Sequence, residues 1–437
     1  MQHKLPTNAD MRSELNDEFH VYPYEPLVPP VRIVTLVMLP SRGDRAQEVA
    51  HLQQLCAQGN HDTSRSTLNR LYFDGFLLKV ESHHEFTRYK FIASANIGHA
   101  TDPFANSPLS LLPEGWLTGL PGRLLVALDT TVLPYPEQAS HQSLFAQYAE
   151  YFSPTSLAAS QIGRSKSLAM TDFQIRDNGM TRMLVFSQAE LPAQIGRLTY
   201  RLIDIETYRM LALVILPQAK NLLKKLPLAD TRLKDLTGAI SEGGGMKDEQ
   251  LMERLTALAA EVEDLIATHY RPFSIAQTRF DLVLQRLDEL YEHPIGPQPT
   301  MGGFLRRRMQ KARSTSESAF HWLDQMAMRV SQASQSLRTR IDVNNAAQNR
   351  GMLAAMNRRF QLQLRLQQAA ELLSVAIFTY YSVNLLEYIY QELALLLAWD
   401  VQSVLFKSLA APVLAIAAVV FIYRRRAKVT AKTDTSL

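Results

Sequence analysis

The pattern of apolar and polar positions divides the chain into a strand-rich part and a helix-rich part. Up to about residue 190, short apolar runs alternate with turn signals, which is typical of strands. The predicted strands are Val31–Leu39, Leu68–Phe73, Phe76–Glu81, Phe86–Ile92, Leu124–Leu133, Ala169–Arg176 and Met180–Phe186, with one helix over Asp44–Gln58. Asp74-Gly75 supplies the tight turn of a hairpin. We therefore expect an α+β domain over 1–190 with a mostly antiparallel sheet.

The apolar residues of the next part, 191–300, recur at helical spacing. Two charged amphipathic helices are predicted there, Asp248–Thr268 and Ser274–Glu292, and Pro272 is expected to separate them. The glycine-rich stretch Ser241–Lys247 predicts a flexible link before the first of these helices.

A long helix is expected to form a stalk over 301–371, because no proline occurs between Phe304 and Pro412. Its candidate contact positions follow the alternating spacing of three and four residues that is typical of a coiled coil. They are Phe320, Leu323, Ala327, Val330, Ser334, Leu337, Ile341 and Asn344. Because several of them are small or polar, we expect the stalk to pack on partners, and we expect copies of the chain to form a homo-oligomer.

Two apolar runs follow the stalk, Leu372–Tyr390 and Val404–Tyr423. Each is close to the roughly 20 residues that cross the hydrocarbon core of a bilayer. We therefore predict a two-helix transmembrane hairpin over 372–423, followed by a basic tail over 424–437. The alternative is a buried helical hairpin of a soluble protein. It is disfavoured because both runs reach membrane length.

Positive charge flanks the predicted hairpin on both sides. The chain has 437 residues and a net charge of +4, and from Val343 to Ala370 its only charged residues are arginines. The basic residues nearest the two runs are Arg358, Arg359, Arg365, Arg424, Arg425 and Arg426. The positive-inside rule then places both termini in the cytoplasm, with the basic flanks on anionic lipid. For the same reason we expect membrane lipid, and no nucleic acid, as a partner.

Two polar residues inside the first run, Asn384 and Glu387, have two interpretations. In an assembly of several copies they would lie at the outer mouth of an ion path, because such residues usually face a bundle interior or water. Alternatively, Glu387 lies at the outer interface beside Tyr388 and Tyr390 of an aromatic belt. The second interpretation is favoured.

The chain offers little that indicates catalysis. Its one cysteine, Cys56, excludes an intramolecular disulfide. His83-His84-Glu85 is the one compact group of metal-capable side chains, but neighbouring strand residues point to opposite faces, so a solvated strand end is favoured over a metal site. Gly163–Ser167 lacks the residue order of a phosphate loop. No cofactor can be assigned, and an enzyme is the least favoured class.

Several short motifs resemble a bacterial family of unknown function, numbered 3422. These motifs are Leu15–His20 followed by Pro23, His84–Tyr89, Leu120–Arg123, Ile205–Met210 and the block Leu364–Tyr381. The resemblance covers nearly the whole chain. It implies an uncharacterised protein of the bacterial inner membrane and indicates no activity.

The predicted architecture also resembles that of CorA-type magnesium channels, which are pentamers with a Gly-Met-Asn signature. That signature is missing here, where the region reads Val383–Glu387. Two alternative functions therefore follow from the sequence. In the first, the hairpin anchors and oligomerises a cytoplasmic domain that binds a partner or ligand. In the second, the chain is a CorA-like divalent-cation channel whose first membrane helix lines the pore.

Overall fold

The computed structural model describes residues 24–397, except 42, 68, 96–101, 165, 190 and 243–245, together with ten positions nearer the termini. These residues form nine strands and six longer helices. The strands are β1 (Val31–Leu39), β2 (Arg70–Phe73), β3 (Phe76–Ser82), β4 (Thr87–Ser94), β5 (Arg123–Pro134), β6 (Ala158–Gln161), β7 (Ser167–Thr171), β8 (Thr181–Ser187) and β9 (His293–Pro294). The helices are α2 (Asp44–Gln58), α3 (His141–Tyr148), α4 (Pro192–Leu213), α5 (Ile215–Glu242), α6 (Asp248–Asp288) and α7 (Met301–Leu397). The chain separates into two units, Met1–Ser334 and Gln335–Leu437, and the division falls within α7.

The first unit contains one mixed sheet, in the order β2-β3-β4-β1-β5-β8-β7-β6-β9. β5 and β8 pair in parallel, whereas the other neighbouring strands pair antiparallel. The sheet was predicted to be mostly antiparallel, and the structure corrects this to a mixed sheet because β5 and β8 pair in parallel. The reason is that the crossover from β5 to β8 spans α3, β6 and β7, and apolar periodicity does not specify strand order.

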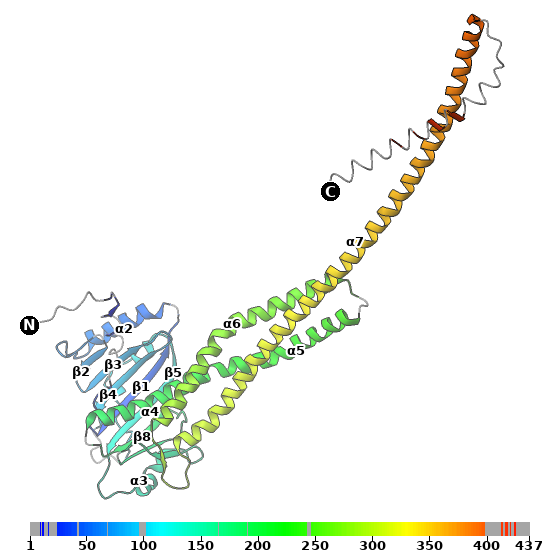
Figure 1. Ribbon diagram of the computed structural model, residues 1–437. Helices are drawn as coiled ribbons and strands as arrows, with labels where there is room; N and C mark the ends of the chain where they lie inside the picture. Colours follow the sequence, from blue (N-terminus) through cyan, green and yellow to red (C-terminus); the bar gives the residue numbers. More distant parts are fainter. Residues whose placement is uncertain are drawn as a thin grey trace, which may run out of the picture. The chain divides into compact units, whose positions relative to one another are not determined.

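β1 lies in the middle of the sheet and is buried along almost its whole length. One of its faces, with Val34 and Leu36, belongs to an apolar core that includes Leu55 of α2. The opposite face of the sheet is covered by α4 (Figure 1). Burial on both faces explains why the strand reads as an unbroken apolar run.

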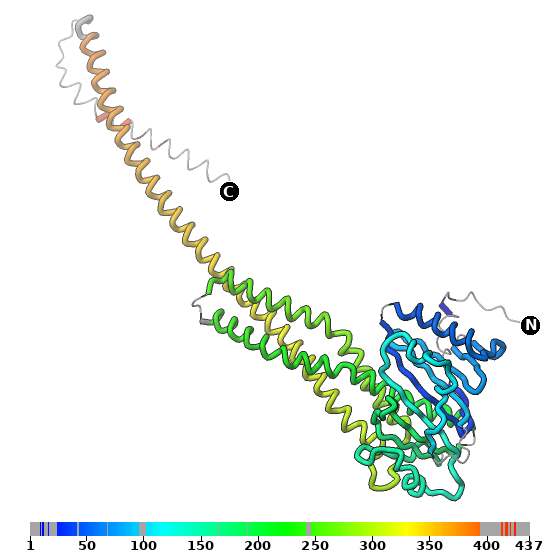
Figure 2. Tube along the Cα trace, turned by 180° about the vertical axis from the view of Figure 1, so that it is seen from behind, coloured from blue at the N-terminus to red at the C-terminus, as the bar shows by residue number. Residues whose placement is uncertain are grey.

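α5, α6 and the first part of α7 lie side by side as a three-helix bundle (Figures 1 and 2). α4 ends and α5 begins around Val214, close to the break that Pro217 predicts. The predicted division of α6 is wrong, because α6 continues through Pro272. The missing N–H of proline costs one helical hydrogen bond, and buried residues on both sides, such as Val262 and Phe273, keep the helix in the bundle.

The buried positions of α7 within the first unit follow a regular spacing of three and four residues. From Leu305 onward they are Leu305, Met309, Ala312, Ser316, Ala319, Leu323, Met326, Val330 and Ala333. The predicted contact positions Leu323 and Val330 belong to this stripe, but Phe320 and Ala327 lie beside it and are half-buried. This packing joins helices of one chain, and it gives no support to a coiled coil between chains.

The predicted two-helix transmembrane hairpin is also wrong. The described residues show one long apolar helix, α7, which continues past the predicted end of the first run at Tyr390. No glycine or proline occurs between Glu371 and Leu397 to end it. Most of the second run, Val404–Tyr423, lies outside the described residues, as does part of the predicted link Ser241–Lys247.

Candidate functional site

A cluster of charged side chains is buried between the sheet and α4. Lys79 and Glu81 lie on the same face of β3 because strand side chains alternate between faces. The antiparallel register places Lys79 opposite Lys90 and Glu81 opposite Arg88 of β4. All four residues are 6% exposed or less. We refer to these four residues, with Glu25, Arg70 and Asp204, as the buried ionic cluster.

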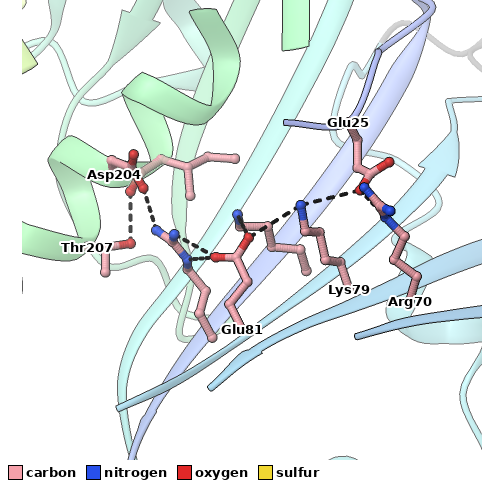
Figure 3. A network of polar contacts seen from close by, with 9 residues as sticks. Glu25, Arg70, Lys79, Glu81, Asp204 and Thr207 are labelled. Carbon is pink, nitrogen blue, oxygen red and sulfur yellow. Dashed lines mark hydrogen bonds and ion pairs between the residues drawn. The ribbon is translucent and has the colours of Figure 1, made fainter. Parts of the chain in front are cut away.

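Glu81 is the centre of the buried ionic cluster (Figure 3). Arg88 donates to its Oε2 atom from Nε at 2.7 Å, and Lys90 donates to Oε1 from Nζ at 2.6 Å. Burial by itself would raise the pKa of Glu81, but the charges of Arg88 and Lys90 outweigh it and lower the pKa to about 2. Glu81 is therefore ionised at every physiological pH.

Two further segments of the chain supply the outer carboxylates of the cluster. Asp204 of α4 accepts a hydrogen bond from Arg88 Nη1 at 2.6 Å. Glu25 accepts one from Arg70 Nε at 2.6 Å and lies 3.3 Å from Lys79 Nζ. The N-terminal segment, the strands β2, β3 and β4, and α4 are thus joined by charge-assisted contacts.

Lys90 is the most unusual member of the cluster. Its side chain is fully buried, and its Nζ atom lies 4.0 Å from the ring centroid of Tyr200 on α4. Full burial, followed by the nearby charge of Arg88, lowers the pKa of Lys90 to about 7. A lysine with such a pKa has the chemistry of a general base or nucleophile. Because the side chain has no exposed surface, a substrate would reach it only if α4 left the sheet.

Sequence reasoning missed the buried ionic cluster. The alternation of Leu78 and Val80 with Lys79 and Glu81 resembles a strand with one solvated face. The available signal is that β4 also carries two cations, Arg88 and Lys90, at the same period. A charged face on two paired strands, with Glu81 opposite Arg88, is compatible with burial as well as with solvation.

His83-His84-Glu85 lies in the connection between β3 and β4. The ring of His83 stacks on Phe86 at 4.4 Å between centroids, and burial lowers its pKa. Glu85 forms an ion pair with Arg279 of α6. Within the residues that the structure describes, no group of three or more histidine, cysteine or acidic side chains could hold a metal ion.

The predicted site residues of the C-terminal region lie on α7 where they are described. Asn384 and Glu387 are half-buried, and Gln391 Nε2 lies 3.5 Å from Glu387 Oε1 on the same helix. Arg358, Arg359 and Arg365 are exposed. Arg424 is exposed as well, whereas Arg425 and Arg426 lie outside the described residues. A ring of pore helices around Asn384 and Glu387 stays a prediction.

α7 contains the one candidate membrane span found in the described residues. Its most apolar 18-residue window has a mean hydropathy of 1.4, and none of that window is buried. Large apolar side chains such as Leu372, Phe378 and Leu385 are more than 60% exposed. By length and composition, this helix is able to cross a membrane.

A comparison with protein-family models found a match over most of the chain. A family described as "Protein of unknown function (DUF3422)" matches residues 7–429. The chain belongs to this family, as the short motifs predicted. A search of curated proteins found no match. The similarity to CorA-type channels is not supported by the family match or by the fold.

Proposed function

We propose that the chain is a membrane-anchored protein in which the apolar part of α7 crosses the bacterial inner membrane and holds the α+β unit at its cytoplasmic surface. The observation that carries this proposal is that no residue in the apolar window of α7 is buried. Exposed apolar surface of this extent is unfavourable in water, whereas a helix in lipid satisfies all of its backbone hydrogen bonds internally.

We infer the side of the membrane on which the α+β unit lies from the charges next to the span. Arg358, Arg359 and Arg365 precede the span, and the residues from Val343 to Ala370 include no acid. Basic residues next to a span favour the cytoplasmic side. The α+β unit then serves as the part that binds a partner or ligand, and the span restricts that binding to the membrane surface.

Membrane fractionation tests the anchor. The full chain is expected in carbonate-washed membranes, and a chain that ends at Ala370 is expected in the soluble fraction. Ile377→Arg, which places a charge within the apolar run, is expected to shift the full chain toward the soluble fraction. Ser336→Arg serves as the control outside the span. Full-length protein in the soluble fraction would contradict the proposal.

We also propose that copies of the chain associate through α7. Leu353, Met356 and Phe360 are 63%, 65% and 61% exposed and lie on one face of the helix. Arg358 and Arg365 lie away from that face, so parallel copies that enter the membrane at the same residue would pair their apolar faces and keep these charges apart.

Disulfide crosslinking in membranes tests this association. In a Cys56→Ser background, Met356→Cys is expected to give a crosslinked dimer, and Arg358→Cys, on a different face, is expected to give little. Equal crosslinking at both positions would indicate random collision and would contradict a specific interface.

A further inference from the structure

A pocket opens between α6 and α7 on the side of the helix bundle, within the first unit of the chain. Its volume is about 510 Å³, which is within the range of roughly 300 to 1,000 Å³ of ligand pockets. Two of the buried residues that line it are small: Ala276 of α6 and Ser316 of α7 are 3% and 4% exposed. These two small side chains leave space between the helices.

Three aromatic rings line one end of the pocket. Phe320 of α7 stacks on Phe273 of α6, with 5.4 Å between centroids and 29° between the planes. Tyr270 lies 6.0 Å from Phe320 and is 60% exposed. Phe320 lies next to the buried stripe of α7 and is half-buried, so part of its ring is left uncovered by the bundle. The aromatic wall presents ring surface to whatever enters the pocket.

The charged residues that line the pocket give it a negative character. Arg313 is held by two carboxylates, Asp281 at 2.7 Å and Glu317 at 2.8 Å, so its charge is offset. Asp324 lines the aromatic end, one turn along α7 from Phe320, and the described residues provide it with no ion-pair partner. An anion entering this end would meet Asp324, whereas a cation would be attracted by both the carboxylate and the rings.

We propose that this pocket binds an organic cation with an aromatic or alkyl group. The electron-rich faces of Tyr270 and Phe320 attract a cation, and such contacts strengthen when the cation is shielded from water. Asp324 supplies the counter-charge, and the buried ring of Phe273 supports the aromatic wall. Aromatic side chains are a common means of binding quaternary ammonium groups.

Direct binding to the full chain in lipid nanodiscs tests the proposal, with benzyltrimethylammonium as the probe and benzenesulfonate as its anionic counterpart. Saturable binding of the cation is expected, with much weaker binding of the anion. Asp324→Asn and Phe320→Leu are each expected to weaken cation binding at least about tenfold. Glu263→Gln, which removes a carboxylate of α6 outside the pocket, is the matched control.

Three results would overturn the proposal. These are the absence of saturable cation binding, equal binding of the anion, and unchanged affinity in Asp324→Asn. Circular dichroism of each variant establishes that the bundle is intact. Phe320→Leu is preferred to alanine, because leucine keeps most of the apolar contact with Phe273 while removing the ring face.

Discussion

Lys79 and Lys90 lie directly opposite each other across β3 and β4, and both side chains are almost completely buried. Like charges at opposed positions of a sheet are destabilising. The buried ionic cluster contains four cations, from Arg70, Lys79, Arg88 and Lys90, against three carboxylates, from Glu25, Glu81 and Asp204. One positive charge is therefore in excess, and the lowered pKa of Lys90 means that this residue gives up its proton most readily.

The first prediction is that Lys90→Met stabilises the protein at neutral pH by about 1–4 kcal/mol, because the lowered pKa of Lys90 means that burying its ammonium group costs free energy even beside Glu81. Between about pH 7, the pKa of Lys90, and its ordinary value of 10.5, the unfolded chain binds more protons than the folded chain. The stability of the parent protein should therefore rise with pH through this window, and that of the variant should not.

Urea unfolding followed by the fluorescence of buried Trp116 measures both effects. Lys234→Met is the control, because that side chain is 67% exposed. A Lys90→Met variant less stable than the parent would show that the ammonium contributes more as a partner of Glu81 than it costs by burial.

The second prediction concerns acid. The pKa of Glu81 is lowered to about 2 from an ordinary value of 4.5, so ionised Glu81 stabilises the folded state above about pH 4.5. This contribution, on the order of 3 kcal/mol, is lost as the pH falls from 4.5 toward 2. Glu81→Gln should destabilise the protein at pH 7 and should remove much of this acid dependence. Unfolding curves at about pH 7, 5 and 3 provide the measurement, and equal acid dependence in both proteins would argue against the assignment.

The third prediction uses the close approach of α4 to the N-terminal segment. A Cβ atom at Gly196 would lie 2.0 Å from the backbone oxygen of Glu25. Gly196→Ala must therefore displace this segment and weaken the contacts of Glu25 with Lys79 and Arg70. We expect destabilisation of about 1–3 kcal/mol.

The matched control is Gly238→Ala on α5, where an added Cβ meets nothing within 4 Å. Because alanine is the better helix former, this variant should gain about 0.5–1 kcal/mol. Thermal unfolding of the two variants should therefore shift in opposite directions.

Local features of the fold could be predicted from the sequence, and long-range features could not. The strand β1 and the helix α2 have the predicted bounds Val31–Leu39 and Asp44–Gln58, because apolar runs and a terminal glycine are local signals. The parallel pairing of β5 with β8 depends on strand order, which no local pattern encodes. The path of α6 through Pro272 depends on tertiary packing that overrides the cost of the proline.

The same distinction applies to the candidate sites. The exposed apolar part of α7 could be predicted, because length and hydropathy define it. The buried ionic cluster could not, because Glu25, Glu81 and Asp204 come from three separate parts of the chain and meet only after folding. The aromatic pocket has the same origin, since Phe273 and Phe320 belong to helices that run side by side.

The last prediction concerns Arg279, which joins three elements. It forms an ion pair with Glu85 in the connection between β3 and β4, and its Nη1 atom donates to the carbonyl oxygen of Leu211 at 3.1 Å. Leu211 lies in the last turn of α4, whose carbonyl groups lack partners within the helix. Arg279→Leu removes both interactions and should cost about 1–3 kcal/mol. Glu85→Gln keeps the bond to Leu211 and should cost less.

Arg232→Leu is the matched control for Arg279→Leu, because Arg232 pairs with Glu261 and both side chains are about half exposed. An exposed pair of this kind contributes about 0–1 kcal/mol. The expected order of destabilisation is Arg279→Leu, then Glu85→Gln, then Arg232→Leu, measured by urea unfolding of the full chain. If Glu85→Gln cost as much as Arg279→Leu, the ion pair alone would account for the contribution, and the bond to the end of α4 would have no role in stability.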